Sequence, residues 1–320
     1  MKLATFEIVG TRKIGAVTGD GDKLVDFTAA SGGDPRFASM LALIEAGDGA
    51  LETARLFLAE AERSGDHLIP LADVTLLAPI PVPPQFRDFS VFPAHIVQAP
   101  VGMKKLVAAL EGKPIPDVEP GDVPAVYRNQ PIYYITNRFS VVGPETTVRW
   151  PRYSSYMDHE IELAMVLSKG GKDIPVERAG EHIFGYTIFN DFSARDAQIV
   201  EMGGMLGPAK GKSFDAGNAL GPFLVTKDEI PDVKTLKASV RINGESVMSD
   251  DCSAMLHSFE EMIAFVSRDE TLHAGEVFGS GTVNNGCGLE HFTFLSDGDV
   301  VELEFDRIGV LRNTVVRQDG

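Results

Sequence analysis

Cysteine is scarce in this chain of 320 residues, which has only Cys252 and Cys287. Two cysteines cannot form a disulfide framework, and this pair lacks the clustered spacing of a zinc site. Uncharged apolar runs approaching the ~18 residues of a membrane span are missing as well. The charged Glu7 lies close to the first residue, which is not typical of a secretory leader. We therefore expect a non-exported protein of the reducing cytoplasm, with no membrane partner.

Positive charge is also in short supply, because 29 basic side chains stand against 46 acidic ones and the formal net charge is −17. Nucleic acids and acidic membranes are bound by clusters of Lys and Arg, and this composition offers no such attraction. We therefore exclude a nucleic-acid partner. Part of the acidic excess can instead surround a divalent cation in a pocket.

The apolar pattern divides the chain into two unequal parts. Residues 1–28 alternate short apolar runs with Gly and Asp turns, which predicts a small antiparallel meander. Apolar residues at helical spacing follow at 37–46 and 49–63. Four of the six residues after position 78 are prolines, which disfavours both a helix and a central strand there. We predict a small N-terminal α/β domain over 1–78 and a larger domain over 79–320.

Strand patterns dominate the larger part, whereas helical spacing is confined to 94–111, 193–204 and 258–268. The expected fold class is therefore α+β and β-dominated, with peripheral helices. The predicted strands cover 132–135, 139–142, 146–150, 160–167, 183–190, 221–226, 236–242, 276–282 and 299–304.

Acidic side chains interrupt the apolar strand pattern at two places. Glu160 and Glu162 begin one apolar run, and residues two apart in a strand point to the same face. Burying adjacent carboxylates is costly unless a cation or protons compensate, so the pattern favours either a metal site or a solvated sheet face. Asp191 ends a second apolar run, where it either binds an ion or caps the following helix.

A further acidic residue, Asp88, lies seven residues before His95. Taken alone, Asp88 is an ordinary loop residue, and a single histidine more often makes structural hydrogen bonds than catalyses a reaction. Oxygen ligands without nearby cysteine or paired histidine select magnesium, calcium or manganese over zinc. If these acids converge in the fold, a hard divalent cation is the expected ligand.

Five segments in consistent order over residues 80–320 resemble motifs of the fumarylacetoacetate hydrolase family. Each motif alone is weak, but five collinear ones together are specific. The resemblance implies that a mixed β-sandwich roll forms the larger domain and that the protein is a homodimer. The segments are Asp88 to His95, Glu160 to Leu163, Asn190 to Asp196, Gly207 to Asp215, and Gly279 to Glu290.

The resemblance also assigns roles to side chains. In family members that hydrolyse carbon–carbon bonds, a histidine deprotonates water while a distant glutamate holds the imidazole, and these positions match His95 and Glu290. The implied ion is Mg²⁺, with Ca²⁺ or Mn²⁺ as alternatives. The implied metal ligands are Asp88, Glu160, Glu162 and Asp191.

The implied reaction is cleavage of a carbon–carbon bond in a β-diketo acid of the fumarylacetoacetate or acylpyruvate type, with a metal-stabilised enolate leaving group. One family branch has a glutamate three residues after the histidine, where this chain has Gln98, whereas Glu290 resembles the fumarylacetoacetase branch. We therefore expect a hydrolase. The alternatives are a lyase or isomerase of the same family (decarboxylase, 2-keto-3-deoxy acid dehydratase, or keto–enol or diene-dioate isomerase) and a non-catalytic small-molecule-binding protein.

The expected substrate is a small anionic keto acid. Fumarylacetoacetases carry an arginine where this chain has Lys104, and a lysine replaces a planar bidentate donor with a point charge. Tyr134 matches a further position, although Tyr133 could take its role. Residues 96–132 form either a lid or a static surface loop. The substrate-binding positions implied by the resemblance are Lys104, Tyr134, Arg195, Gln198, Lys212 and Thr282.

Overall fold

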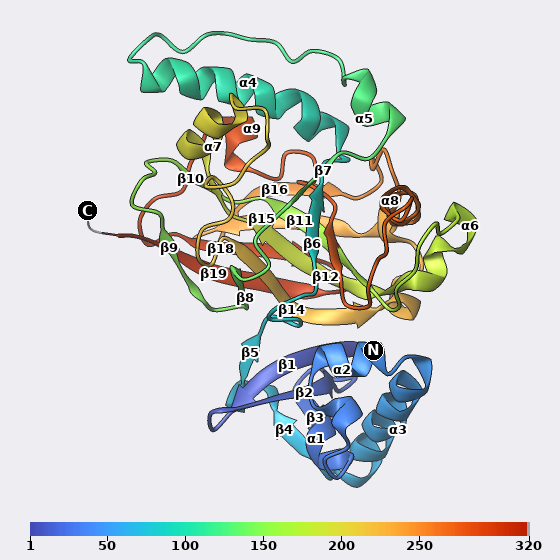
Figure 1. Cartoon of the computed structure of the whole chain (residues 1–320). Helices are drawn as coiled ribbons and strands as arrows, with labels where there is room; N and C mark the ends of the chain where they lie inside the picture. The colour runs from blue at the N-terminus through green and yellow to red at the C-terminus, as the bar shows by residue number, and fades with distance from the viewer. Residues whose placement is uncertain (319–320) are drawn as a thin grey trace.

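An antiparallel meander opens the chain in the computed structural model, which describes residues 1–318 (Figure 1). Its strands are β1 (Lys2–Ile8), β2 (Thr11–Val17) and β3 (Lys23–Asp26). Val9 and Gly10 join the first two strands, and both have positive φ angles, as a two-residue type I′ hairpin turn requires. The meander expected from the sequence is therefore present.

Short helices cover this meander and form an aromatic cluster with it. The rings of Phe27 and Phe37 lie 5.8 Å apart, and Phe57 packs 5.2 Å from Phe37. The side chain of Ser39 accepts a hydrogen bond from the backbone N–H of Ala42 and so caps a helix start. The helices are α1 (Phe27–Ala30), α2 (Met40–Glu45) and α3 (Asp48–Ser64), followed by strands β4 (Leu68–Pro70) and β5 (Thr75–Leu77).

A twelve-stranded sheet joins this N-terminal segment to the rest of the chain. β1 pairs with β14 (Asn218–Thr226) through Leu3 and Leu224, so the meander continues the central sheet. The order is β4-β3-β2-β1-β14-β12-β11-β17-β6-β7, with β5 on β1 and β8 on β14. The other strands are β6 (Phe86–Phe89), β7 (Tyr133–Ile135), β8 (Val141–Val142), β11 (Ile161–Leu167), β12 (Ile183–Asp191) and β17 (Val277–Gly279).

The predicted boundary between 1–78 and 79–320 stays a prediction. The two segments share a sheet, and one hydrophobic cluster contains side chains from both, including Phe27 and Phe189. In Figure 1 the N-terminal segment nevertheless lies apart, below the main body.

A second, five-stranded sheet packs against one face of the central sheet, and the layer between the two sheets is the larger hydrophobic core. Side chains along the second sheet alternate between buried and more exposed, and Val301, Leu303 and Phe305 point into the core. This sandwich confirms the predicted β-dominated α+β fold. In order, the strands are β16 (Glu245–Asp251), β15 (Lys237–Ile242), β18 (Val300–Phe305), β19 (Gly309–Arg317) and β9 (Thr147–Trp150).

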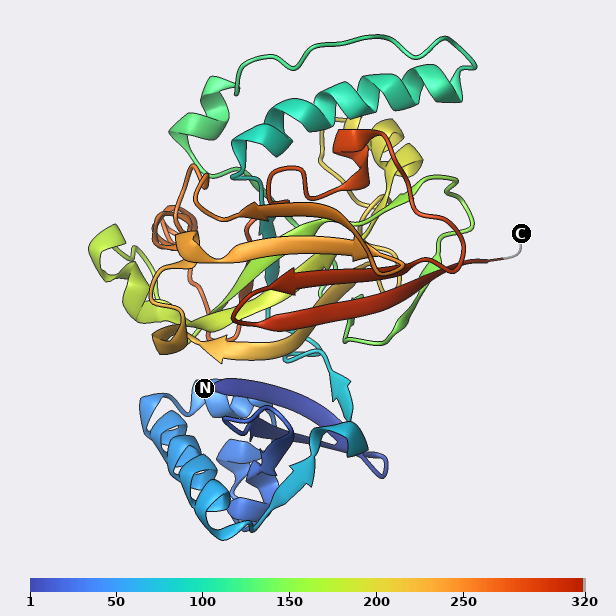
Figure 2. The same ribbon diagram turned by 180° about the vertical axis from the view of Figure 1, so that it is seen from behind.

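Helix α4 (Pro93–Leu110) crosses one end of the sandwich, close to the short helix α9 (Gly288–His291) (Figures 1 and 2). Pro93 occupies the first turn of α4, where its missing N–H costs nothing. Gly102 permits the close approach of the two helices, because a Cβ atom there would lie 2.3 Å from the carbonyl oxygen of Leu289. This packing brings the start of α4 next to α9.

The remaining elements are short helices and strands. The helical patterns at 193–204 and 258–268 correspond to α7 and α8, and residues 96–132 contain most of α4, an irregular stretch and α5. Within residues 1–318, no helix combines the length and the apolarity needed to cross a bilayer. These elements are α5 (Ala125–Asn129), α6 (Val176–Ala179), α7 (Arg195–Met202), α8 (Phe259–Val266) and the paired strands β10 (Met157–Asp158) and β13 (Ser193–Ala194).

Candidate metal centre and active site

Three of the predicted metal ligands converge on adjacent strands of the central sheet. Asp88 lies on β6, Glu162 on β11 and Asp191 at the end of β12, and one carboxylate oxygen from each lies within 4.8 Å of the others. Gly279 of β17 lies between two of them, since a Cβ atom there would be 2.5 Å from Asp88 Oδ1 and 2.8 Å from Glu162 Oε2. A side chain at this position would fill the space where the carboxylates meet.

The hydrogen bonding of these three residues fits a bound cation. Asp88 Oδ1, Glu162 Oε1 and Asp191 Oδ1 are buried without a hydrogen-bond partner, and buried polar atoms are rarely left in this state. Burial raises the pKa of Glu162 and of Asp191 well above the usual value, and it raises that of Asp88 to about 6. Buried carboxylates with free oxygens are the ligands that hard divalent ions prefer, so the donor set fits Mg²⁺ or Mn²⁺.

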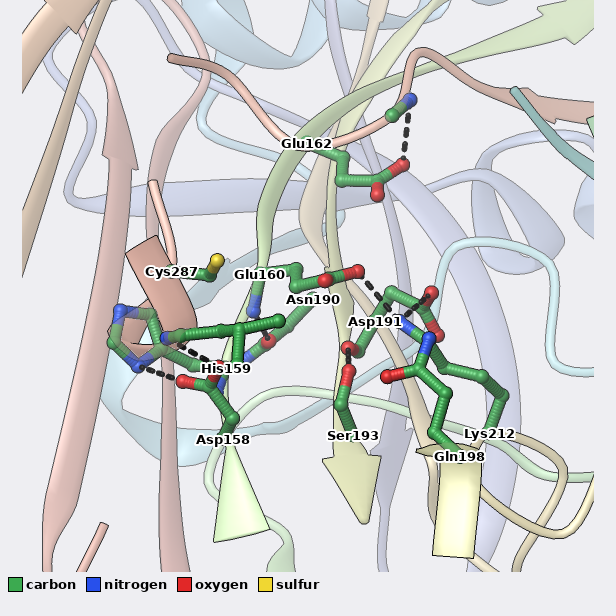
Figure 3. A network of polar contacts seen from close by, with 12 residues as sticks. Asp158, His159, Glu160, Glu162, Asn190, Asp191, Ser193, Gln198, Lys212 and Cys287 are labelled. Carbon is green, nitrogen blue, oxygen red and sulfur yellow. Dashed lines mark hydrogen bonds and ion pairs between the residues drawn. The ribbon is translucent and has the colours of Figure 1, made fainter. Parts of the chain in front are cut away.

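Glu160, the fourth predicted ligand, is bound to two buried cations. Its Oε1 lies 2.7 Å from the Arg195 guanidinium and its Oε2 lies 2.5 Å from Lys212 Nζ. Lys212 Nζ also lies 2.6 Å from Asp191 Oδ2, and thus links Glu160 to the other carboxylates (Figure 3). Burial alone would raise the pKa of Glu160, but Lys212 and Arg195 outweigh it and hold that pKa below its usual range. Glu160 is therefore a neighbour of the three converging carboxylates and is held by cations.

His95 and Glu290 meet although they are far apart in sequence. His95 Nδ1 on α4 lies 3.5 Å from Glu290 Oε1 on α9. Glu290 accepts hydrogen bonds from the backbone N–H groups of Asn285 and Cys287, each at 3.1 Å, which fixes its carboxylate. The Cys287 thiol lies 3.8 Å from the same His95 nitrogen. His95 also lines the pocket.

Asp158 joins the two halves of the site, a role that no motif in the sequence indicated. Its carboxylate accepts hydrogen bonds from the Arg195 side chain at 2.7 Å and from the backbone N–H groups of Gly288 and Leu289 at 2.8 and 2.9 Å. It therefore connects the cation beside Glu160 to the start of the helix that carries Glu290. The sequence signal is weak, because Asp158 stands within the same acidic segment as Glu160 and nothing distinguishes it there.

Asp88, Glu160, Glu162 and His95 line one cavity of about 530 Å³. Tyr134 lines it and donates a hydrogen bond to Asp191 Oδ2 at 2.7 Å, and the buried hydroxyl of Thr282 points there without a partner. Lys104 is exposed on α4 and is not among the lining residues, so the structure does not bring it into the pocket. Apolar side chains of α4 and α7 form the outer wall: Ile96, Ala99, Met103, Ile199 and Met202.

The fold and the site together define a class of protein, a β-dominated α+β sandwich with a deep pocket whose floor carries converging carboxylates. The protein-family model described as fumarylacetoacetate (FAA) hydrolase C-terminal matches residues 96–316 of this chain. The chain belongs to the fumarylacetoacetate hydrolase family, as the resemblance of its five motifs indicated.

Similar proteins cover nearly the whole chain. The mitochondrial oxaloacetate tautomerase fahd2 of Xenopus laevis is 34% identical over 306 residues, which are 95% of this chain and 86% of that protein. A solved fumarylacetoacetate hydrolase of Exiguobacterium antarcticum is 28% identical and has a TM-score of 0.74, with 99% of this chain and all of that one covered. A maleylpyruvate hydrolase of Sphingobium sp. SYK-6, solved with manganese and pyruvate, is 23% identical (TM-score 0.72, both chains fully covered) and shares the fold.

Proposed function

We propose that this protein is an enzyme that uses a divalent cation to interconvert the keto and enol forms of a small 2-oxo dicarboxylic acid of the oxaloacetate type. The observation that carries the proposal is the meeting of Asp88, Glu162 and Asp191, which have free buried oxygens. Asp88 and Glu162 line the same pocket as His95, the residue that Glu290 holds. The similarity of 34% to an oxaloacetate tautomerase over nearly the whole chain supports this reaction above others of the family.

The metal would be held by Asp88, Glu162 and Asp191. Glu160 lies next to this set, because Lys212 bridges it to Asp191. Buried carboxylates outnumber the buried cations Lys212 and Arg195 at the pocket floor, so a dication restores the charge balance. When bound, such an ion polarises the carbonyl oxygen of a 2-oxo acid and makes the neighbouring C–H more acidic. We propose Mg²⁺ or Mn²⁺, because the ligand atoms are oxygens.

His95 carries the proton in this proposal. Glu290 lies against Nδ1 and fixes the tautomer in which Nδ1 is protonated, so Nε2 has a lone pair directed into the pocket. Nε2 takes the proton from the carbon next to the carbonyl group, and the same proton is delivered to the carbonyl oxygen to give the enol. Tyr134 keeps a proton at ordinary pH, because burial raises its pKa well above the usual value, and it orients the Asp191 carboxylate as a hydrogen-bond donor.

A second candidate is the hydrolysis of a carbon–carbon bond in a β-diketo acid. The observation that favours it is the buried Glu290 behind His95, since a histidine held in this way can also deprotonate a water molecule. The 28% identity to a fumarylacetoacetate hydrolase is consistent with this reaction. Hydrolysis differs from tautomerisation in that water must enter the pocket together with the substrate.

One set of assays distinguishes the two reactions. Metal-free protein is supplied with Mg²⁺ or Mn²⁺ and given enol-oxaloacetate, whose decay is followed by ultraviolet absorbance, or acylpyruvates and fumarylacetoacetate, whose cleavage is followed by product analysis. We expect cation-dependent loss of the enol and little cleavage. Cleavage without tautomerisation would replace the first proposal by the second, and cation-independent turnover would contradict both.

Two variants connect the activity to the site. We expect His95→Gln to lower kcat by about 10² to 10⁴, the usual contribution of a general base, while the metal-induced rise in melting temperature is kept. The control is His182→Gln, because the His182 side chain hydrogen-bonds to the Lys169 carbonyl and does not line the pocket. Near-normal turnover of His95→Gln would remove His95 from the mechanism.

Two further family-level expectations stay predictions. A homodimer is checked by the molar mass in light scattering. A cytoplasmic location is checked by cell fractionation, which is informative because the Xenopus laevis relative is named as mitochondrial.

A further inference from the structure

Cys287, His95 and Glu290 form a cluster of potential metal ligands that is separate from the three carboxylates. One ligand atom from each lies within 4.8 Å of the others. The Cys287 and Glu290 side chains are buried, whereas 13% of the His95 side chain is exposed, and this residue lines the pocket. The cluster therefore has an opening on the side of the histidine.

The spacing of the ligand atoms is close to that around a tetrahedral ion. Cys287 Sγ lies 3.8 Å from His95 Nδ1. The Glu290 carboxylate approaches His95 Nδ1 to 3.5 Å through Oε1 and Cys287 Sγ to 3.3 Å through Oε2, and one of its oxygens lies within 4.8 Å of both other ligand atoms. A tetrahedral zinc ion with bonds of about 2.0–2.3 Å separates its ligand atoms by about 3.3–3.7 Å. The three groups therefore need only local side-chain movement to surround one ion, and a fourth position is left for water or another ligand.

The donor types differ from those of the carboxylate centre. A thiolate, an imidazole and a carboxylate select zinc over magnesium or calcium, which bind oxygen. One thiolate and one carboxylate balance the charge of Zn²⁺ when the imidazole is neutral, and the thiol proton is released to solvent on binding. Each oxygen of Glu290 accepts one backbone N–H bond, so lone pairs remain for a metal and the N–H bonds orient the carboxylate.

We propose that Cys287, His95 and Glu290 form a second metal site that binds Zn²⁺ and switches the enzyme off. The inhibitory part rests on the proposed function of His95. A metal on Nδ1 leaves the single proton of the neutral imidazole on Nε2, so the nitrogen that faces the substrate can no longer accept a proton. The residue opposite Cys287 in a strand bridge is Glu160, and Figure 3 shows these two residues side by side. Because Lys212 links Glu160 to Asp191, the proposed zinc site neighbours the carboxylate centre.

Metal binding is tested first and does not depend on any activity. Metal-free protein receives excess Mg²⁺ to fill the carboxylate centre and is then titrated with Co²⁺ as a spectroscopic probe for zinc. We expect one Co²⁺ per chain, a thiolate-to-cobalt charge-transfer band in the near ultraviolet, and loss of the band when Zn²⁺ is added. Cobalt bound without a thiolate band would overturn the site, because the carboxylate centre offers only oxygen.

Two variants locate the site, and the other cysteine is the matched control. In Cys287→Ser the band disappears and zinc affinity falls by at least about tenfold, since losing even an outer-shell partner costs about 10–100-fold. Cys252→Ser, at a buried cysteine outside the pocket, keeps both. His95→Gln serves as a second ligand variant if Cys287→Ser does not fold, and it also weakens zinc binding. Unchanged zinc affinity in a folded ligand variant would contradict the assignment.

Inhibition is measured as the ratio of each variant's rate with Zn²⁺ to its own rate with Mg²⁺ alone. We expect zinc to inhibit the wild type and Cys252→Ser, with recovery on selective chelation, and we expect Cys287→Ser to resist it. Zinc binding without inhibition would overturn the switch. If no reaction is found with Mg²⁺, the proposed function fails, while the cobalt and zinc titrations still decide the site.

Discussion

Removing one negative charge from the carboxylate centre should have opposite effects on the protein with and without metal. Glu162→Gln keeps the shape of the side chain and an oxygen that can accept the Gly281 N–H bond, which is 2.9 Å long in the wild type. The substitution removes the repulsion between Glu162 and both Asp88 and Asp191. We therefore expect the metal-free variant to be more stable than the wild type, and its metal binding to be lost.

The magnitude follows from the geometry. Two unit charges at 4.8 Å, the upper limit of the separations between these carboxylate oxygens, repel by about 3.5 kcal/mol at an effective dielectric constant of about 20. Lys212 and partial protonation offset part of this repulsion, so we expect a net gain of about 1–3 kcal/mol, or about 2–4 °C in melting temperature for each kcal/mol. With saturating Mg²⁺ or Mn²⁺ the order reverses, since only the wild type gains the free energy of metal binding.

The stability difference between metal-free Glu162→Gln and the metal-free wild type also depends on pH. Burial raises the pKa of Glu162 and Asp191 in the folded chain, so the folded metal-free protein binds more protons than the unfolded chain and loses stability as pH rises through the raised values. The advantage of Glu162→Gln should therefore be absent below the ordinary glutamate pKa of 4.5 and should grow above it.

Differential scanning fluorimetry from pH 4 to about pH 8, with chelator or with metal, measures how the melting temperatures of the variant and the wild type compare under each condition. The control is Glu181→Gln, at an exposed glutamate paired with Arg178. A metal-free Glu162→Gln protein that is less stable than the wild type at pH 8 would refute the argument that repulsion dominates the centre. An undiminished metal-induced shift would show that Glu162 is not a ligand.

Three further predictions address the surroundings of the centre. Gly102→Ala should lower the free energy of unfolding by about 1–3 kcal/mol and also reduce kcat, because a Cβ atom 2.3 Å from the Leu289 carbonyl oxygen would push α4 away from α9. Denaturant unfolding and steady-state kinetics measure the two effects, and an unaffected kcat would contradict the prediction. Lys212→Met should destabilise the metal-free protein by about 3–5 kcal/mol, because the buried Glu160 loses its ion pair with Lys212. In a thermal melt, added Mg²⁺ should restore part of the lost stability. The metal-induced rise in melting temperature should be larger at pH 8 than at pH 5, because metal competes with protons for carboxylates such as Asp88, whose pKa is about 6; equal shifts would argue against these ligands.

Much of the fold could be read from local patterns. Buried strands such as β11 and β12 are largely apolar runs, and amphipathic or capped helices such as α3 and α8 carry their own signals. Strand β16 was missed because it is an edge strand whose side chains are mostly exposed, so its conformation depends on pairing with β15.

By itself, the sequence determined the family, the β-dominated fold and the positions of the acidic residues, because each of these is encoded in short segments and in their order along the chain. Which acids share one space was decided only by the register of β6, β11, β12 and β17, where Gly279 leaves room between Asp88 and Glu162. The same holds for Cys287, whose distance from His95 depends on the packing of α4 against α9. Spacing along a chain does not fix distances between residues that meet only after strands pair and helices pack.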